Sequence, residues 1–135
     1  MKRVLSALLL CILALTLCAC ATQNPMQDAL TATRNTGSIE IYVNSTAAVY
    51  VITDRETVRE ICDTFGALEL EKSLITKPLG TAYTIRFCNA NGVATETLTV
   101  VAGYNVIVFD DMYRVQDDFD VHAYVADLIE NAEQK

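Results

Sequence analysis

The sequence has few of the residues from which catalytic sites are assembled. His122 is its only histidine, so a catalytic Ser–His or Cys–His pair would have to use that side chain. It falls in the first turn of a predicted C-terminal helix, one step from the apolar stripe, where an exposed, solvated histidine is expected. The sequence also has no Walker loop, no zinc-spaced Cys/His set and no G-x-S-x-G motif. A non-enzymatic protein without a cofactor or metal is therefore predicted.

Basic residues are scarce beyond the first positions. Without Lys2 and Arg3 the chain keeps eight basic side chains against seventeen acidic ones. An acidic balance of this size argues against binding to nucleic acid and against electrostatic adhesion to anionic lipids. No nucleic-acid partner is expected.

The five cysteines do not make a disulfide framework. Cys11 and Cys18 belong to the N-terminal segment and Cys20 to the motif at its end, so two remain for the folded part. The apolar patterns place Cys62 and Cys88 on opposite sides of the inner layer of the predicted sheet. This favours free thiols, and the alternative of a disulfide needs a β-bulge that rotates Cys88 inward.

Residues 1–19 have the order of a secretory signal peptide. Lys2 and Arg3 precede the fourteen-residue apolar stretch VLSALLLCILALTL, and small residues follow it. As a helix this stretch would span about 21 Å, which is short of a hydrocarbon core of ~30 Å. A cleaved signal peptide is therefore favoured over a membrane-spanning helix.

The signal ends in Leu17-Cys18-Ala19-Cys20, which resembles the lipobox of bacterial lipoproteins: Leu, a small residue, Ala or Gly, then Cys. The resemblance implies that signal peptidase recognises Leu17 and Ala19, and that the Cys20 thiol carries diacylglycerol. Cys18 departs from the usual Ala, Ser or Thr but is also small. Secretion without lipid is the alternative, since Ala19-Cys20-Ala21 also fits the A-x-A cleavage rule. The expected location is the outer face of the cell membrane.

The chain after the signal divides into two parts. Residues 20–37 carry Pro, Gly and many small polar residues, and they are predicted to be the lipidated cysteine and a flexible tether. Such a tether would let the domain roam ~20–25 Å from the membrane. A short helix within Pro25–Arg34 would bury little. Residues 38–135 are predicted to form a single domain that is large enough to bury its own core.

Alternating apolar residues and turn signals predict the element order β-β-α-β-β-β-β-α in this domain. A capping box, Thr53-x-x-Glu56, opens the first helix, and Gly66 suits its left-handed end. Strands are expected at 39–43, 47–52, 68–71, 83–87, 95–101 and 106–109, with a short seventh at 112–115, and helices at 53–66 and 120–129.

Hairpins dominate this order and no βαβ unit recurs. The predicted class is therefore α+β: an antiparallel sheet of about five to seven strands with two helices packed on one face. Phe87 is expected to face the first helix. The other face is expected to be open, and the positions that alternate with core residues and share it are Tyr42, Thr84, Arg86 and Thr97. Tyr and Arg are frequent at binding hot spots, so this face is a candidate binding surface; the alternative is an ordinary solvated face.

One dense acidic run stands near the C-terminal helix. Calcium needs several converging oxygens, and the EF-hand form needs a glycine at its sharp turn, which this run lacks. Turn formation and helix capping are the favoured interpretation. The run consists of Asp110, Asp111, Asp117, Asp118 and Asp120.

Four segments together look like a family of small, uncharacterised lipoproteins of Gram-positive bacteria. They are Ile39–Val43, then Val49–Glu60 (VYVITDRETVRE), then Tyr83–Phe87, and finally Tyr113. In that family a strand ending in Asp leads into a helix, and a YxIxF-type strand follows. The resemblance covers residues 38–129, implies an extracytoplasmic location and transfers no site residues.

The expected function is that of a membrane-anchored, non-enzymatic binding or interaction module. Its partners would be the membrane, through the lipid on Cys20, and an envelope protein, peptide or wall ligand. A small envelope hydrolase, or an accessory factor of an envelope enzyme, is the alternative.

Overall fold

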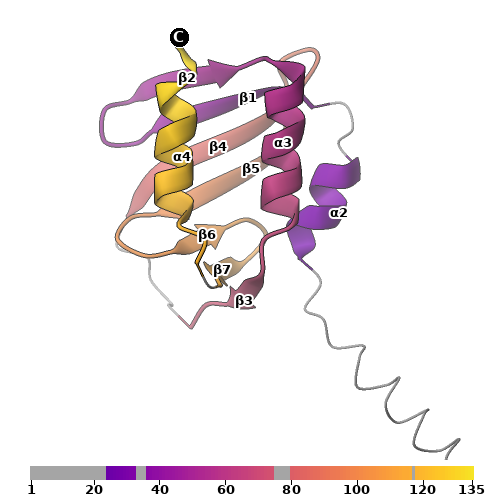
Figure 1. Ribbon diagram of the computed structural model, residues 1–135. Coiled ribbons are helices and arrows are strands. Elements are labelled where there is room, and N and C mark those ends of the chain that lie inside the picture. Colours follow the sequence, from indigo (N-terminus) through magenta and orange to yellow (C-terminus); the bar gives the residue numbers. More distant parts are fainter. Residues whose placement is uncertain (1–23, 33–35, 75–79, 117) are drawn as a thin grey trace, which may run out of the picture.

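The computed structural model describes residues 24–32, 36–74, 80–116 and 118–135. They form an α+β fold in which one open antiparallel sheet carries helices on one face (Figure 1). The predicted class is confirmed, and the sheet, with eight strands, is slightly larger than expected. No helix in these ranges has the length and apolar character needed to cross a membrane.

Three helices and eight strands make up the described fold. The helices are α2 (Pro25–Ala32), α3 (Arg55–Gly66) and α4 (Val121–Glu130). The strands are β1 (Thr36–Val43), β2 (Ala48–Ile52), β3 (Leu70–Lys72), β4 (Thr81–Asn89), β5 (Ala94–Val101), β6 (Val106–Val108), β7 (Met112–Val115) and β8 (Glu133–Gln134). Their order across the sheet is β3-β7-β6-β5-β4-β1-β2-β8.

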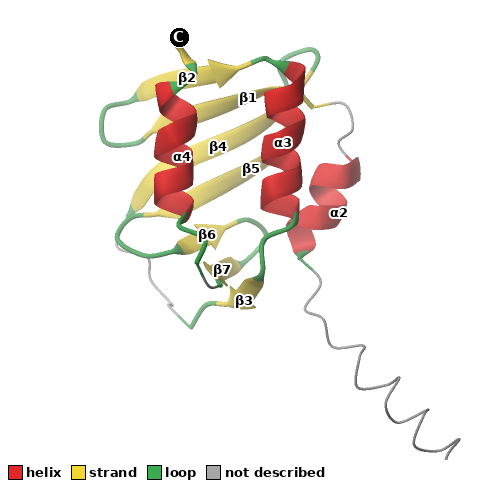
Figure 2. Ribbon diagram, in the orientation of Figure 1, coloured by secondary structure: helices red, strands yellow, loops and turns green. Residues whose placement is uncertain are grey.

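The centre of the sheet has the register that the alternating pattern predicts. In the β1–β4 pair Ile39 lies opposite Phe87 and Ile41 opposite Ile85, and all four side chains are buried. Because side chains alternate between the two faces of a strand, the residues between them turn to the other face. Helices α3 and α4 lie side by side over the buried face, as Figure 2 shows.

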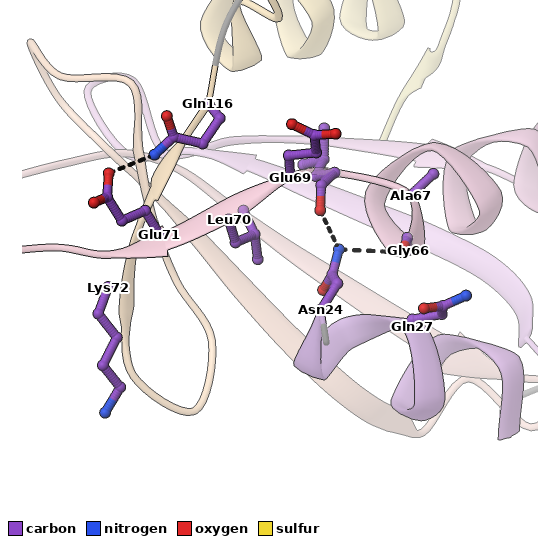
Figure 3. A pocket seen from close by; sticks show the side chains of 10 residues that line it. Asn24, Gln27, Gly66, Ala67, Glu69, Leu70, Glu71, Lys72 and Gln116 are labelled. Carbon is purple, nitrogen blue, oxygen red and sulfur yellow. Dashed lines mark hydrogen bonds between the residues drawn. The ribbon is translucent and has the colours of Figure 1, made fainter. Parts of the chain in front are cut away.

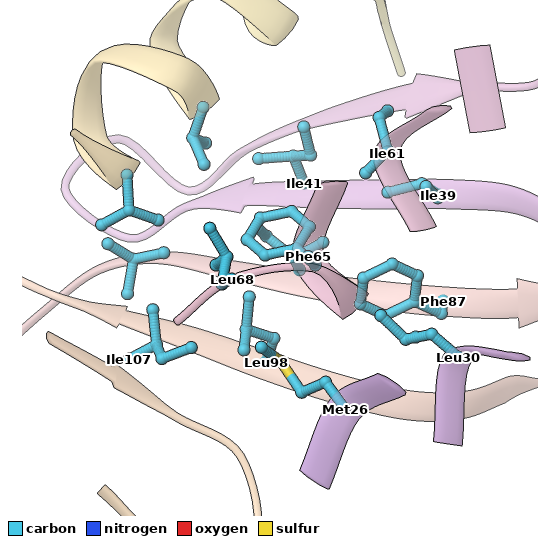
Figure 4. Close-up of a cluster of buried hydrophobic side chains, with 14 of the residues drawn as sticks. Met26, Leu30, Ile39, Ile41, Ile61, Phe65, Leu68, Phe87, Leu98 and Ile107 are labelled. Carbon is cyan, nitrogen blue, oxygen red and sulfur yellow. The ribbon is translucent and has the colours of Figure 1, made fainter. Parts of the chain in front are cut away.

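The core lies between this face and the helices (Figure 4). Phe65 of α3 is fully buried, and its ring meets Phe87 edge-on at 6.2 Å between ring centroids. Tyr124 of α4 contacts the same ring at 5.8 Å. The aromatic cluster therefore joins both long helices to the middle of the sheet.

Helix α3 begins one residue later than the capping box predicted. Asp54 is the N-cap, and its carboxylate accepts hydrogen bonds from the Thr57 amide at 2.9 Å and the Thr57 hydroxyl at 2.7 Å. Aspartate is a strong N-cap because its charge also complements the positive end of the helix dipole. At the other end Gly66 is helical rather than left-handed, and Ala67 is the C-cap with φ −95°.

Helix α2 overturns the expected tether over residues 24–32. Met26 is 0% and Leu30 5% exposed, and both belong to the core cluster, at whose edge they lie in Figure 4. The helix packs against α3. Two apolar residues spaced four apart share one helix face, and that is enough to dock a helix this short. The domain core therefore begins before Ser38.

Strand β8 was not expected. Val51 pairs with Glu133 and Tyr50 with Gln134, which adds an outermost strand beside β2. A short polar edge strand has no apolar alternation by which it could be predicted. It brings the C-terminal segment to the border of the open face.

Candidate functional site

The four residues predicted to share the open face do lie together. Tyr42 of β1 is opposite Thr84 of β4, and Arg86 of β4 is opposite Thr97 of β5. All four alternate with buried residues, so they point away from α3 and α4. The structure therefore places them on one surface of three adjacent strands.

Arg86 and Tyr42 form the centre of a hydrogen-bonded cluster on this surface. The Arg86 guanidinium donates to the Tyr42 hydroxyl at 2.8 Å and to Glu40 Oε2 at 3.1 Å. The Tyr42 hydroxyl donates in turn to Glu40 Oε2 at 3.0 Å. The guanidinium carbon also lies 5.7 Å from the centroid of the Tyr42 ring, within cation–π range. These contacts hold both side chains in fixed positions.

Glu40 and Lys135 complete the cluster, and the sequence did not single them out. Lys135 Nζ lies 3.1 Å from Glu40 Oε1, so two cations share one carboxylate. Glu40 is recognisable as a polar position of β1, whereas Lys135 reaches the face only because β8 joins the sheet. We call Glu40, Tyr42, Arg86 and Lys135 the open-face cluster.

The side chains of the open-face cluster sum to one positive charge on an acidic protein. Burial raises the pKa of Glu40, but hydrogen bonds from Lys135 and Tyr42 and the charges of Lys135 and Arg86 lower that pKa below its usual value overall. The carboxylate is thus ionised at neutral pH. Its side chain is 13% exposed, against 37% for Arg86 and 66% for Lys135. A ligand would therefore meet the cations and the tyrosine before the carboxylate.

Thr84 and Thr97 lie beside the open-face cluster, and within the part of the chain that the structure describes neither is hydrogen-bonded to it. The Thr84 hydroxyl is 3.3 Å from the side-chain nitrogen of Asn44, whose amide also donates to the Thr81 hydroxyl at 2.7 Å. Thr97 is exposed next to Arg86. These threonines extend the polar surface on either side of the guanidinium.

His122 is not the exposed histidine that the helix position predicts. Its Nε2 lies 2.8 Å from the Val101 carbonyl oxygen and 3.0 Å from that of Tyr104, and its ring packs on Tyr83 at 6.1 Å. Carbonyl oxygens only accept, so Nε2 carries the proton and donates. The side chain thereby ties α4 to the end of β5 and to the turn that follows it.

The two thiols of the domain are free, as the pattern favoured. A bulge does occur between Phe87 and Cys88, but it does not bring the sulfurs together. Burial raises the pKa of Cys62, and burial and the nearby Glu40 carboxylate raise the pKa of Cys88. Both thiols are therefore protonated at neutral pH, and neither is an activated nucleophile.

The acidic run serves turns, strand contacts and a helix cap. Asp111 pairs with Lys72 at 2.7 Å, and Asp110 accepts a hydrogen bond from the Tyr113 hydroxyl at 2.8 Å. Burial and the Asp110 carboxylate raise the pKa of Tyr113 to about 12. Asp120 is the N-cap of α4, as predicted.

Across the described residues, no group of three or more acidic, histidine or cysteine side chains is arranged to hold a metal ion. Asp118 is exposed, and Asp117 lies outside the described residues. So do Leu17, Ala19 and Cys20 of the lipobox, and the whole predicted signal peptide.

Comparisons with protein-family models, with curated proteins and with solved structures found no match to this chain. The resemblance to Gram-positive lipoproteins therefore stays a prediction.

Proposed function

We propose that the protein is a lipoprotein of the bacterial envelope, anchored through Cys20 at the outer face of the cell membrane. Its domain is a non-enzymatic module that binds an envelope protein, a peptide or a wall ligand on the open face of the sheet. The observation that carries this proposal is the open-face cluster, in which hydrogen bonds order Arg86 and Tyr42 on the face of the sheet that none of the described helices covers.

Preorganisation is the physical reason to assign binding to this cluster. Arginine and tyrosine contribute most to affinity where their side chains are already ordered, because less conformational entropy is lost when a partner arrives. The bonds to Tyr42 and Glu40 both use Nη1 of Arg86, so among the described residues the other guanidinium nitrogens keep N–H donors without a partner. A carboxylate or carbonyl of the partner is the group that these donors fit best.

The non-enzymatic character is supported by what surrounds the reactive groups. His122 Nε2 is taken by two carbonyl oxygens. Raised pKa values keep the Cys62 and Cys88 thiols protonated. Within the part of the chain that the structure describes, no feature favours the alternative of a hydrolase or an accessory factor.

The anchor is tested by Cys20→Ser. We expect this variant to incorporate no labelled palmitate and to leave the membrane fraction or accumulate unprocessed, because serine lacks the thiol that receives diacylglycerol. Cys18→Ser is the matched control and should be lipidated like the natural chain. Equal lipid labelling of Cys20→Ser and the natural chain would contradict the proposal.

The binding face is tested with a partner captured by cross-linking in the native envelope. Arg86→Ala and Tyr42→Ala are each expected to weaken its affinity by about tenfold or more, the effect of truncating a hot-spot residue. Arg59→Ala, which removes an exposed arginine from α3, is the control and should bind normally. Circular dichroism establishes that each variant is folded. Unchanged affinity in both open-face variants would exclude this surface.

A further inference from the structure

Strand β3 presents an outer edge that no described strand pairs with. It is the first strand in the sheet order and has β7 as its one neighbour among the described residues. On the side that faces β7, the Glu69 carbonyl accepts a hydrogen bond from the Gln116 amide at 2.9 Å. On the same side the Ser73 amide donates to the Met112 carbonyl at 2.9 Å. Because bonding alternates along a strand, the backbone groups of Leu70 and Lys72 face outward.

A groove of about 1060 Å³ runs along this outer edge (Figure 3). Its far wall is formed by Gln27 of α2 and by the end of α3 at Gly66. The Asn24 amide closes one end of the groove, where it donates to the Leu68 carbonyl at 2.8 Å. The open part of the edge therefore starts at Leu70, with room beside it for one more extended chain.

The groove is negatively charged. Glu69 and Glu71 are exposed along the strand, and α3 ends here with no basic residue in its last turn, so the negative end of its dipole adds to theirs. The one cation in the lining, Lys72, is paired with Asp111 at 2.7 Å. A basic segment would thus meet the carboxylates of Glu69 and Glu71, while the charge of Lys72 is offset by Asp111.

The same charges disfavour a second copy of this chain as the occupant. An antiparallel pair of two β3 strands that sets Leu70 opposite Lys72 also sets Glu71 opposite Glu71. The register that sets Leu70 opposite Leu70 brings Glu71 against Glu69. Like charges directly opposite each other destabilise a strand pair. The edge is therefore protected against its own copies and open to a chain of opposite charge.

We propose that β3 binds an extended, lysine- or arginine-bearing polypeptide segment, which adds to the sheet as a further strand. Its backbone hydrogen-bonds to the outward groups of Leu70 and Lys72, as in other cases of strand addition. Its basic side chains, spaced two apart, lie beside Glu69 and Glu71. This site is separate from the open-face cluster, so the two can be tested independently.

The probe is a fluorescent peptide, acetyl-Thr-Lys-Thr-Lys-Thr-Lys-Thr-amide, and its counterpart carries glutamate in place of lysine. The full chain, in detergent micelles, is expected to bind the basic peptide at least about tenfold more tightly than the acidic one. Hydrogen exchange gives a direct readout. The amides of Leu70 and Lys72 should gain protection when the basic peptide binds, whereas the Ser73 amide is already protected by β7.

Two substitutions at one position separate backbone pairing from charge. Lys72→Pro removes an outward N–H and leaves the bonds to β7 intact, a placement in which edge strands tolerate proline. Lys72→Thr removes the same charge and keeps the N–H. We expect about a tenfold or larger loss of affinity in Lys72→Pro and normal binding in Lys72→Thr.

If Lys72→Pro fails to fold by circular dichroism, the double variant Glu69→Gln, Glu71→Gln tests the same site without touching the backbone. It should lose the preference for the basic peptide. Equal affinity of Lys72→Pro and Lys72→Thr, or equal binding of both peptides by the natural chain, would overturn the proposal. The proposal would also be overturned if the natural chain sediments as a dimer without peptide and Lys72→Pro sediments as a monomer. A second copy of the chain would then be the occupant of the edge.

Discussion

Replacement of Phe87 by alanine is expected to lower the free energy of unfolding by about 3–5 kcal/mol. The Phe87 side chain is 0% exposed and lies at the centre of the sheet, where its ring meets that of Phe65. Truncation removes the transfer energy of the ring and leaves a cavity that close-packed neighbours cannot fill. The loss is a large part of the ~5–15 kcal/mol that stabilises a domain. Urea denaturation of the purified variant measures it.

Tyr104→Ala is the matched control for this variant. Tyr104 is also aromatic, but its side chain is 42% exposed, so truncation should change the unfolding free energy by about 0.5 kcal/mol or less. A Phe87→Ala protein as stable as Tyr104→Ala would place Phe87 on the open face. It would then mean that the register of β4 is off by one residue.

Asn24→Ala is expected to lower the free energy of unfolding by about 2–4 kcal/mol, which is a large effect for a residue outside the described strands. The Asn24 side-chain amide donates to the carbonyl oxygens of Phe65, Gly66 and Leu68 at 3.0, 3.1 and 2.8 Å. Its Oδ1 accepts from the Met26 amide at 2.9 Å and so caps α2. One buried side chain therefore closes the start of α2 and the end of α3. Without it, several backbone groups lose their partners.

Gln27→Ala is the control, because Gln27 lies on the same helix with an exposed side chain. Its unfolding free energy should stay within about 0.5 kcal/mol of the natural chain. Hydrogen exchange sharpens the comparison. In Asn24→Ala the amides of α2 should lose protection while those of β4 and β5 keep theirs. Equal unfolding free energies for the two variants would show that Asn24 does not hold α2 in place.

The parts of the fold that were predictable are those with a strong local period. Strands β1 and β4 alternate strictly between apolar and polar residues, and one slip would expose Ile41 and Phe87 together, so their register follows from the sequence. The same alternation placed Tyr42, Thr84, Arg86 and Thr97 on one surface. These predictions needed no knowledge of distant contacts.

What the sequence did not reveal depends on contacts between distant residues. Helix α2 docks through Met26 and Leu30, too few apolar residues to stand out among polar neighbours. Strand β8 is polar, and Lys135 therefore joined Glu40 across the fold without any local signal. His122 looked exposed because the carbonyl oxygens that bind it belong to β5 and the turn that follows.

The docking of α2 also changes how far the domain could travel. With the lipid on Cys20 that we propose, four peptide units separate the anchor from Asn24, which is fixed to the end of α3. A fully extended segment of this length spans about 14 Å, which is well short of the ~20–25 Å reach of a seventeen-residue coil. The domain would then stay in a thin layer next to the membrane and diffuse along it, and it would not extend far into the cell wall. Its effective concentration would be high for partners that lie close to the bilayer and near zero for those beyond its reach.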